Sequence, residues 1–401
     1  MNDIMEQTIE RLNRLAVKIR KGETIKVGIL GLGSVGNYLL EYLNNWDFPN
    51  VEVYVGCRNV AKAQSDVNIV RVARLIRGKS PKLMHIAELD LDDVSSIARF
   101  FSEVSPDFVV NSSRAYSGLK YGSISWHTIR AYGLWAPLAM KYIRNIMKAH
   151  SQSNSDAIVI NTSYSDAVIP WLKSAGMSYP DFGSGNLNHL IPRIKMAAAE
   201  LFKIPNAADI EVTLATSHFH DVVISKEGQT EGIEPLLHLS YRGEPLKCEA
   251  INELWKRCAI AMPVDAKRNM MNASSNFEII SKIVESIREG KSCVLHTPGV
   301  GGNLGGYPVA IDATGDRVEM CYFERYFSFE EMNAVNRRSF SCDGIEDVRD
   351  GSLYWTPHLA EKVKRCFDVD IPHEVKYDSI PETADFIIGN IIKPYLAKNA
   401  K

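Results

Sequence analysis

Short apolar runs alternate with longer amphipathic stretches through the first part of the chain. The apolar runs that predict buried strands lie at residues 26–30, 51–56, 83–87, 107–111 and 157–160. Between them, apolar positions recur at helical spacing, which predicts helices at residues 61–77, 93–104 and 125–150. Strands that alternate with helices are typical of a parallel sheet covered on both faces. We therefore predict a doubly wound α/β domain.

The residues before the first strand form an amphipathic pattern of their own. Residues 3–21 place one apolar face along a helix, made of Ile4, Ile9, Leu12, Leu15, Ala16 and Ile19. We expect this N-terminal helix to pack on the first domain or on a second subunit.

The pattern after residue 168 is mixed. It predicts a strand at residues 210–215, a glycine-rich hairpin or loop within residues 294–311, and helices ending near 202, 261, 289 and 338. Pro192 suits the first turn of the first of these helices. We therefore expect two lobes, residues 1–168 and a mixed α/β lobe at 169–401. The elements of its C-terminal appendage, from about residue 345, are not predicted.

Composition and charge narrow the class of protein. With 45% hydrophobic and 23% charged residues, the 401-residue chain is typical of a globular protein. A net charge of −2 gives no reason to expect nucleic acid or an anionic membrane as a partner. No stretch reads as a signal peptide or is apolar for long enough to cross a bilayer. The seven cysteines are scattered singly, so we expect free thiols, a cytoplasmic location and no metal site.

The first predicted strand runs directly into a glycine motif. Gly31, Gly33 and Gly36 form G-x-G-x-x-G between this strand and a helix, and a second strand follows at residues 51–56. The first glycine permits a tight turn, the second lets a pyrophosphate approach the backbone, and the third lets the helix pack on the sheet. We expect a dinucleotide to contact Gly31, Gly33, Ser34, Val35, Gly36, Asn111 and Ser112.

The end of the second strand bears on which dinucleotide binds. It reads Gly56-Cys57-Arg58-Asn59, without the acidic residue that would hold an unmodified ribose. Arg58, helped by Asn59, can pair with a 2′-phosphate. The sequence therefore favours NADP(H) over NAD(H).

The loop after the fourth predicted strand, residues 112–122, carries two further candidates. In an open α/β sheet the loops at the carboxyl ends of the strands surround the ligand. Arg114 and Lys120 are therefore candidates for holding an anionic substrate, although either residue fits an ordinary surface charge as well.

In the order of these motifs the sequence resembles the lactate/malate dehydrogenase family over residues 25–345. Asn161 leaves a buried strand as the family's Asn-Pro-Val-Asp element does, with Thr162 in place of the proline. Residues 192–202 are similar to the family helix that places an arginine, here Arg193, on the substrate carboxylate. His218, at the end of a strand, falls where the family has its catalytic histidine.

The resemblance implies an N-terminal Rossmann domain, a substrate lobe and a 2-oxoacid reductase. Arg193 would grip the substrate carboxylate, and His218 would exchange a proton with the carbonyl oxygen while a nicotinamide exchanges hydride. The other residues that it places at the substrate are Arg114, Lys120, Asn161, Ser274 and Ser275. It also implies a homodimer or homotetramer.

One departure concerns the carboxylate that orients the family's histidine. The matching neighbourhood reads Asn188-His189-Leu190, so Asp221 or Asp166 would have to replace it. His220 lies two residues after His218 and competes for the role of acid and base.

Two other functions therefore stay open. The missing carboxylate and the Arg58 region favour an imine reductase of the saccharopine or opine kind. The altered histidine motif favours a nucleotide-binding protein without chemistry.

Overall fold

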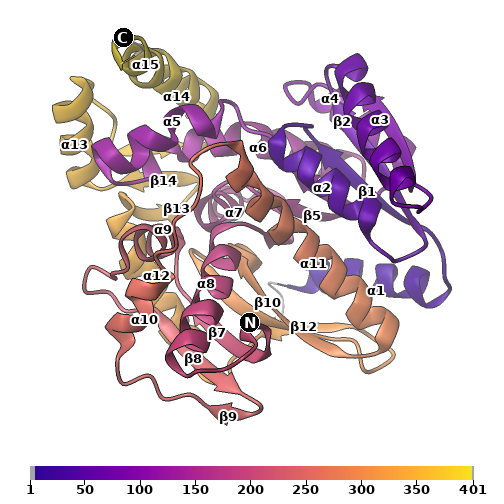
Figure 1. The fold of residues 1–401 in the computed structure, drawn as a ribbon. Coiled ribbons are helices and arrows are strands. Elements are labelled where there is room, and N and C mark those ends of the chain that lie inside the picture. Colours follow the sequence, from indigo (N-terminus) through magenta and orange to yellow (C-terminus); the bar gives the residue numbers. More distant parts are fainter. Residues whose placement is uncertain (1–4, 400–401) are drawn as a thin grey trace.

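The first domain is built on a six-stranded parallel sheet. The structure is a computed structural model, and it describes residues 5–399 (Figure 1). The sheet has the order β3-β2-β1-β4-β5-β6, which confirms the predicted doubly wound arrangement. Its strands are β1 (Ile25–Leu30), β2 (Val51–Cys57), β3 (Leu83–Glu88), β4 (Phe108–Asn111), β5 (Ile158–Asn161) and β6 (Phe182–Gly183). The sheet thus continues beyond residue 168, where we expected the first lobe to end.

Helices cover both faces of this sheet. One face packs against α1, α2 and α3 and also against α11, which belongs to the second lobe. The other face packs against α4, α6 and α7. The helices up to β6 are α1 (Glu6–Arg20), α2 (Ser34–Asn45), α3 (Val60–Ile76), α4 (Val94–Val104), α5 (Gly118–Ile124), α6 (Ala136–Gln152) and α7 (Ser165–Ser174). The expected first helix is present as α1, whose buried face includes Leu12 and Leu15. Residues 3 and 4 of that prediction lie outside the described residues.

The second lobe combines helices with two small antiparallel sheets, β7-β8-β9 and β10-β11-β12. The glycine-rich segment joins two antiparallel strands of the latter, as predicted. The elements are α8 (Asn186–Leu201), β7 (Ile210–Ala215), α9 (His218–Glu227), β8 (Leu236–Tyr241), β9 (Glu244–Pro245), α10 (Ile251–Cys258), α11 (Asn269–Glu289), β10 (Ser292–Pro298), β11 (Gly306–Asp312), β12 (Glu319–Tyr322) and α12 (Phe329–Cys342).

The C-terminal segment, whose elements were not predicted, forms a third small sheet with three helices. Figure 1 shows these elements gathered beside α5 and α6. Their apolar side chains join the same core as α4, α6 and α7. The elements are β13 (Ile345–Arg349), β14 (Ser352–Trp355), α13 (Pro357–Phe367), β15 (Glu374–Lys376), α14 (Ile380–Ile387) and α15 (Lys393–Asn399).

The single helix predicted for residues 125–150 is wrong, because the chain breaks in its middle. A π-helical turn (Ser125–Ile129) ends at Arg130, which adopts a left-handed conformation with φ of 51°. Gly133 follows, and α6 then starts with Pro137 in its first turn, where the missing N–H costs no hydrogen bond. A Cβ at Gly133 would lie 2.6 Å from the carbonyl oxygen of Asp343. The break therefore allows this backbone to approach the end of α12.

Three smaller predictions also differ. Pro192 lies inside α8 rather than in its first turn. Helix α7 follows β5 directly and was missed, and the expected loop at residues 112–122 contains the start of α5. These short elements carry little periodic signal, and tertiary contacts decide their conformation.

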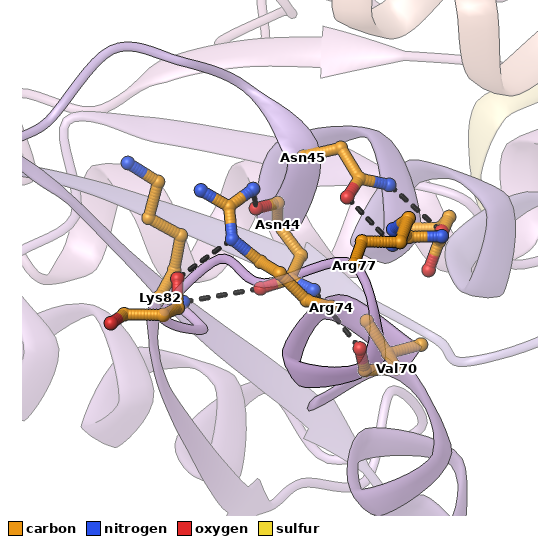
Figure 2. Close-up of polar contacts among 8 residues, drawn as sticks. Asn44, Asn45, Val70, Arg74, Arg77 and Lys82 are labelled. Carbon is orange, nitrogen blue, oxygen red and sulfur yellow. Dashed lines mark hydrogen bonds and ion pairs between the residues drawn. The ribbon is translucent and has the colours of Figure 1, made fainter. Parts of the chain in front are cut away.

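A buried guanidinium ties α2, α3 and the start of β3 together. Arg74 of α3 donates to the carbonyl oxygens of Asn44 and Ser80, the latter at 2.7 Å. The Asn44 side chain in turn donates to the carbonyl of Val70 and accepts from the backbone N–H of Lys82 (Figure 2). These contacts satisfy backbone groups where the chain returns to the sheet edge.

Among residues 5–399, every helix is too short or too polar to span a lipid bilayer.

Candidate active site

A cavity of about 920 Å³ lies between the carboxyl ends of the first-domain strands and helices α8, α9 and α11. Its wall includes the glycine turn after β1 at one end and His218, the first residue of α9, at the other. Helices α8 and α11 contribute Arg193 and Asn272 to the same wall. The cavity thus reaches both groups of residues that the sequence singled out.

The glycine turn has the shape that a pyrophosphate requires. Gly31 has φ of +92°, and a Cβ there would lie 2.9 Å from the Cβ of Ser113. A Cβ at Gly36 would lie 2.4 Å from the carbonyl oxygen of Gly31, so only glycine lets α2 pack this closely. A Cβ at Gly33 would meet no atom within 4 Å, which leaves the backbone open to the cavity. The turn therefore fits a dinucleotide.

Some of the residues that we expect to contact the dinucleotide line the cavity, and others do not. Ser34, Val35, Ser112, Arg58 and Asn59 are in its wall. The Asn59 side chain also caps α3 by accepting from the backbone N–H of Lys62 at 2.9 Å. Asn111 is fully buried below the wall, where it donates to Asn161 at 2.9 Å. It supports the strand ends and does not reach the cavity.

His218 is paired with a carboxylate that the sequence analysis missed. Its Nδ1 lies 3.0 Å from Oδ2 of Asp343, the residue that ends α12. Both residues are buried, with His218 exposed by 8%. The backbone N–H of His218 donates to Oδ2 of Asp166 at 3.0 Å. The imidazole is thereby fixed with its Nε2 as the nitrogen left for another partner.

Asp343 is itself held by the broken helix and by α7. Tyr164 directly precedes α7, and its hydroxyl donates to Oδ2 of Asp343 at 2.7 Å. The backbone N–H of Tyr132 donates to Oδ1 of Asp343 at 2.6 Å. The rings of Tyr132 and Tyr164 also contact the imidazole of His218 edge to face, with centroids 4.6 and 4.9 Å away. The pair thus lies in a buried frame in which Nδ1 of His218 and both carboxylate oxygens of Asp343 are hydrogen-bonded.

This frame shifts the titration of the buried groups. Burial acts to lower the pKa of His218, but the charge and hydrogen bond of Asp343 outweigh it, so the pKa lies above its ordinary value. Burial also raises the pKa of Asp166 to about 6 and that of Asp221 to about 7. Asp166 and Asp221 line the cavity, whereas Asp343 does not.

Arg193 lies in the cavity wall but is largely bound to the protein itself. It is exposed by only 3%. Its Nη1 donates to the carbonyl oxygens of Cys258 and Ile260, at 3.0 and 3.3 Å, and Nη2 contacts the sulfur of Met262 at 2.9 Å. The Nε atom is buried and has no hydrogen-bond partner among the described residues.

His220 lies outside the cavity wall, because it is two residues further along α9. Its Nε2 donates to the carbonyl of Thr230 at 2.9 Å, and its Nδ1 bonds to the Ser339 hydroxyl. Both ring nitrogens are thus occupied by the protein. Burial lowers the pKa of His220, which keeps the ring neutral.

The remaining expected substrate residues divide in the same way. Arg114 lines the cavity, whereas Lys120 is outside its wall, with Nζ 5.8 Å from the Tyr116 ring centroid. Asn161 is buried and donates to the carbonyl of Ser163 at 2.9 Å. Ser274 and Ser275 donate back to carbonyls of their own helix and do not line the cavity. Short polar residues within a helix often bond in this way.

The fold and this site define a class of protein. The sheet order, the glycine turn and a second lobe that closes the cavity are those of a two-lobed Rossmann protein. No family model matches the sequence, and no curated relative matches it.

Solved structures nevertheless match the fold over most of their length. Malate dehydrogenase from Cryptosporidium parvum matches with a TM-score of 0.53 at 14% identity, covering 79% of this chain and 96% of that one. Lactate dehydrogenase from the same organism, in complex with lactic acid and nicotinamide adenine dinucleotide, gives 0.52 at 16% identity, covering 80% and 98%. Malate dehydrogenase from Aeropyrum pernix gives 0.52 at 12%, covering 79% and 97%. The chain therefore has the fold of lactate and malate dehydrogenases, as the resemblance predicted.

Proposed function

We propose that this protein is an NAD(P)-dependent oxidoreductase that acts on a small 2-oxo or 2-hydroxy carboxylic acid. One observation carries the proposal: a single cavity has a glycine turn suited to a pyrophosphate at one end and the buried His218–Asp343 pair at the other. The similar fold of dehydrogenases supports it.

The nicotinamide cofactor, when bound, supplies or accepts the hydride. Gly31, Gly33 and the amino end of α2 would hold its pyrophosphate through backbone N–H groups. In the reductive direction His218 gives the proton on Nε2 to the substrate oxygen, and in the oxidative direction it takes that proton back. Asp343 keeps the Nδ1 proton in place and stabilises the imidazolium.

The loop that carries Arg114 lines the cavity, where it would help to exclude water. A Cβ at Gly118 would lie 2.6 Å from a terminal nitrogen of Arg114, so this glycine makes room for the guanidinium. Arg114 there stabilises negative charge that develops on the substrate oxygen.

We propose NADP(H) as the favoured cofactor. Arg58 lines the cavity at the end of β2, where an acidic residue would repel a 2′-phosphate. Titration of the protein with NADPH and NADH tests this preference, and Arg58→Gln is expected to weaken NADPH binding roughly 10-fold while NADH binding stays unchanged. Equal affinity of the natural protein for both cofactors would contradict it.

The contact with Asp343 bears on both alternatives. The imine reductase drew part of its support from a missing carboxylate beside His218, and the structure contains one. The protein without chemistry drew its support from the altered histidine motif, and His218 is nonetheless paired with a carboxylate. The imine reductase keeps the support of the Arg58 region, and the Asp221 carboxyl in the cavity wall can pair with a substrate ammonium. Turnover of 2-oxoacids only in the presence of an amine would favour that function.

Two histidine variants test the proposed reaction. We expect His218→Gln to lower kcat roughly 1,000-fold for reduction of the best substrate in a panel of 2-oxoacids, with NADPH binding retained. His220→Gln is the matched control, and it should lower the melting temperature but keep kcat within a few-fold. Unchanged turnover in both variants would rule out the histidine mechanism.

Three further expectations stay predictions. They are a homodimer or homotetramer, a cytoplasmic location, and an anionic small molecule as the substrate. Sedimentation of the protein at micromolar concentration tests the first.

A further inference from the structure

Arg193 is poorly placed to be the direct clamp of a substrate carboxylate. A bidentate clamp needs two parallel N–H groups of the guanidinium, and both terminal nitrogens of Arg193 bond to residues 258–262. Among the guanidinium nitrogens only the buried Nε lacks a partner in the described part of the chain. Arg193 therefore holds in place the segment that leads from α10 towards α11.

The same segment ends in a second arginine of the cavity wall. Arg268 closes the 3₁₀ helix η5 (Ala266–Arg268) and directly precedes α11. It lines the cavity together with His218, Arg193 and Asp221. Its side chain makes no hydrogen bond or ion pair with any residue between 5 and 399.

The position of Arg268 is unfavourable without an anion. A cation at the amino end of a helix faces the positive end of the helix dipole. Arg268 stands at this end of α11, a helix of 21 residues. An anion bound there would satisfy both the guanidinium and the helix end.

His189, in the same wall, is neutral because it is buried and lies in the positive electrostatic potential of the two arginines. Burial, together with the charges of Arg268 and Arg193, lowers the pKa of His189 to about 3. Nε2 of His189 and Nε of Arg193 are both buried without a hydrogen-bond partner among the described residues. Because the neutral His189 ring donates to the backbone of Met271, its Nε2 is an acceptor, so the groups able to bind an anion are Arg268 and Nε of Arg193.

We propose that Arg268 binds the substrate carboxylate directly, at an anion subsite formed by Arg268, Nε of Arg193 and the amino end of α11. Arg193 is then chiefly a positioning residue, which anchors residues 258–262 and so places Arg268. This assignment rests on the proposed function. It assigns the carboxylate clamp to Arg268 of η5 and not to Arg193 of α8, the residue that the resemblance implies.

Binding of oxalate, a small dicarboxylate that is not reduced, tests the subsite without turnover. Oxalate titrations in the presence of saturating NADPH should show roughly 10- to 100-fold weaker binding for Arg268→Gln than for the natural protein. Arg268→Lys should recover only part of the affinity, because lysine lacks the fork. Lys267→Gln, an exposed change in the same short helix, should bind oxalate normally.

Arg193 variants separate direct binding from positioning. Arg193→Gln should lower the melting temperature, because it removes the guanidinium hydrogen bonds to the carbonyl groups of residues 258 and 260, and oxalate binding should weaken with it. Arg193→Lys, which can still donate to a carbonyl, should recover both. If Arg268→Gln binds oxalate normally while folded Arg193→Lys does not, the subsite is wrong and Arg193 is the clamp. If oxalate binding depends on Arg268 but no 2-oxoacid is turned over, the subsite stands and the proposed reaction fails.

Discussion

The two ends of the cavity are built in different ways. We name these ends the cofactor end and the catalytic end after the roles that we propose for them. The cofactor end consists largely of one short stretch, Gly31 to Gly36, whose shape depends on backbone conformation and on the absence of side chains. The catalytic end brings together residues from distant parts of the chain, since His218 and Asp343 are 125 residues apart. A local backbone shape tolerates divergence of the rest of the sequence. A constellation of side chains depends on the whole fold closing correctly.

The two ends also differ in their charges. Near His218 the wall holds two carboxyl groups with raised pKa, Asp166 and Asp221, and two arginines, Arg193 and Arg268. Ionisable groups in such a wall cost stability when they carry charge, and they are typical of sites that bind a charged ligand. The catalytic end is therefore where we expect function and stability to oppose each other.

Removal of the carboxylate that orients His218 should produce the largest effect. In Asp343→Asn we expect kcat to fall roughly 100- to 1,000-fold, because the imidazolium loses its partner. Burial of His218 is then opposed only by the charges of Asp166 and Asp221, so the pKa of His218 should fall. The pH above which reduction loses activity should move to lower values, because reduction needs the protonated ring.

Asp347→Asn is the matched control for this change. Asp347 lies four residues further on and forms surface ion pairs with Arg337 and Arg349. Its removal should leave the pH profile of kcat unchanged. An unchanged pH profile in Asp343→Asn as well would show that this carboxylate does not control His218.

The same contrast explains what the sequence could predict. The sequence predicts the parallel sheet because each short apolar run indicates a strand locally. It predicts the glycine turn because only glycine allows the close backbone approach found at Gly36. Asp343 gave no signal, because nothing near it in the sequence indicates that it meets His218. Its place depends on the break at Arg130 and Gly133, which a continuous apolar periodicity concealed.

His218 and His220 could not be separated for a related reason. Both follow the same buried strand, and only the start of α9 at residue 218 assigns them to different sides. Residues two apart on a helix point roughly 200° apart, so one ring lines the cavity and the other packs inside. Arg268 was missed because it lies in a short 3₁₀ turn without periodicity.

A pair of glycine variants should sharpen the comparison at the cofactor end, with an intermediate effect. Gly36→Ala forces a methyl group to within 2.4 Å of the Gly31 carbonyl, so we expect the free energy of unfolding to fall by about 2 to 4 kcal/mol. Gly33→Ala meets no protein atom and should fold normally. It should nevertheless weaken NADPH binding roughly 10-fold, because its methyl group occupies the path of the pyrophosphate. Thermal melts and cofactor titrations of both variants measure this separation, and equal loss of stability would contradict it.

The smallest effect concerns a charge at the catalytic end. Because burial raises the pKa of Asp221 to about 7, the folded state holds this proton more tightly than the unfolded state, where a pKa near 3.9 is expected. Ionisation of Asp221 therefore reduces the stability of the natural protein as pH rises from about 4 to about 7. Asp221→Asn removes that loss, so the variant should be more stable by about 1 to 2 kcal/mol at pH 8 and equal to the natural protein near pH 4. Denaturant unfolding at the two pH values measures the difference. A stability gain of the same size at both pH values would mean that the two side chains differ in packing and not in buried charge. The proposed opposition between charge and stability at the catalytic end would then fail.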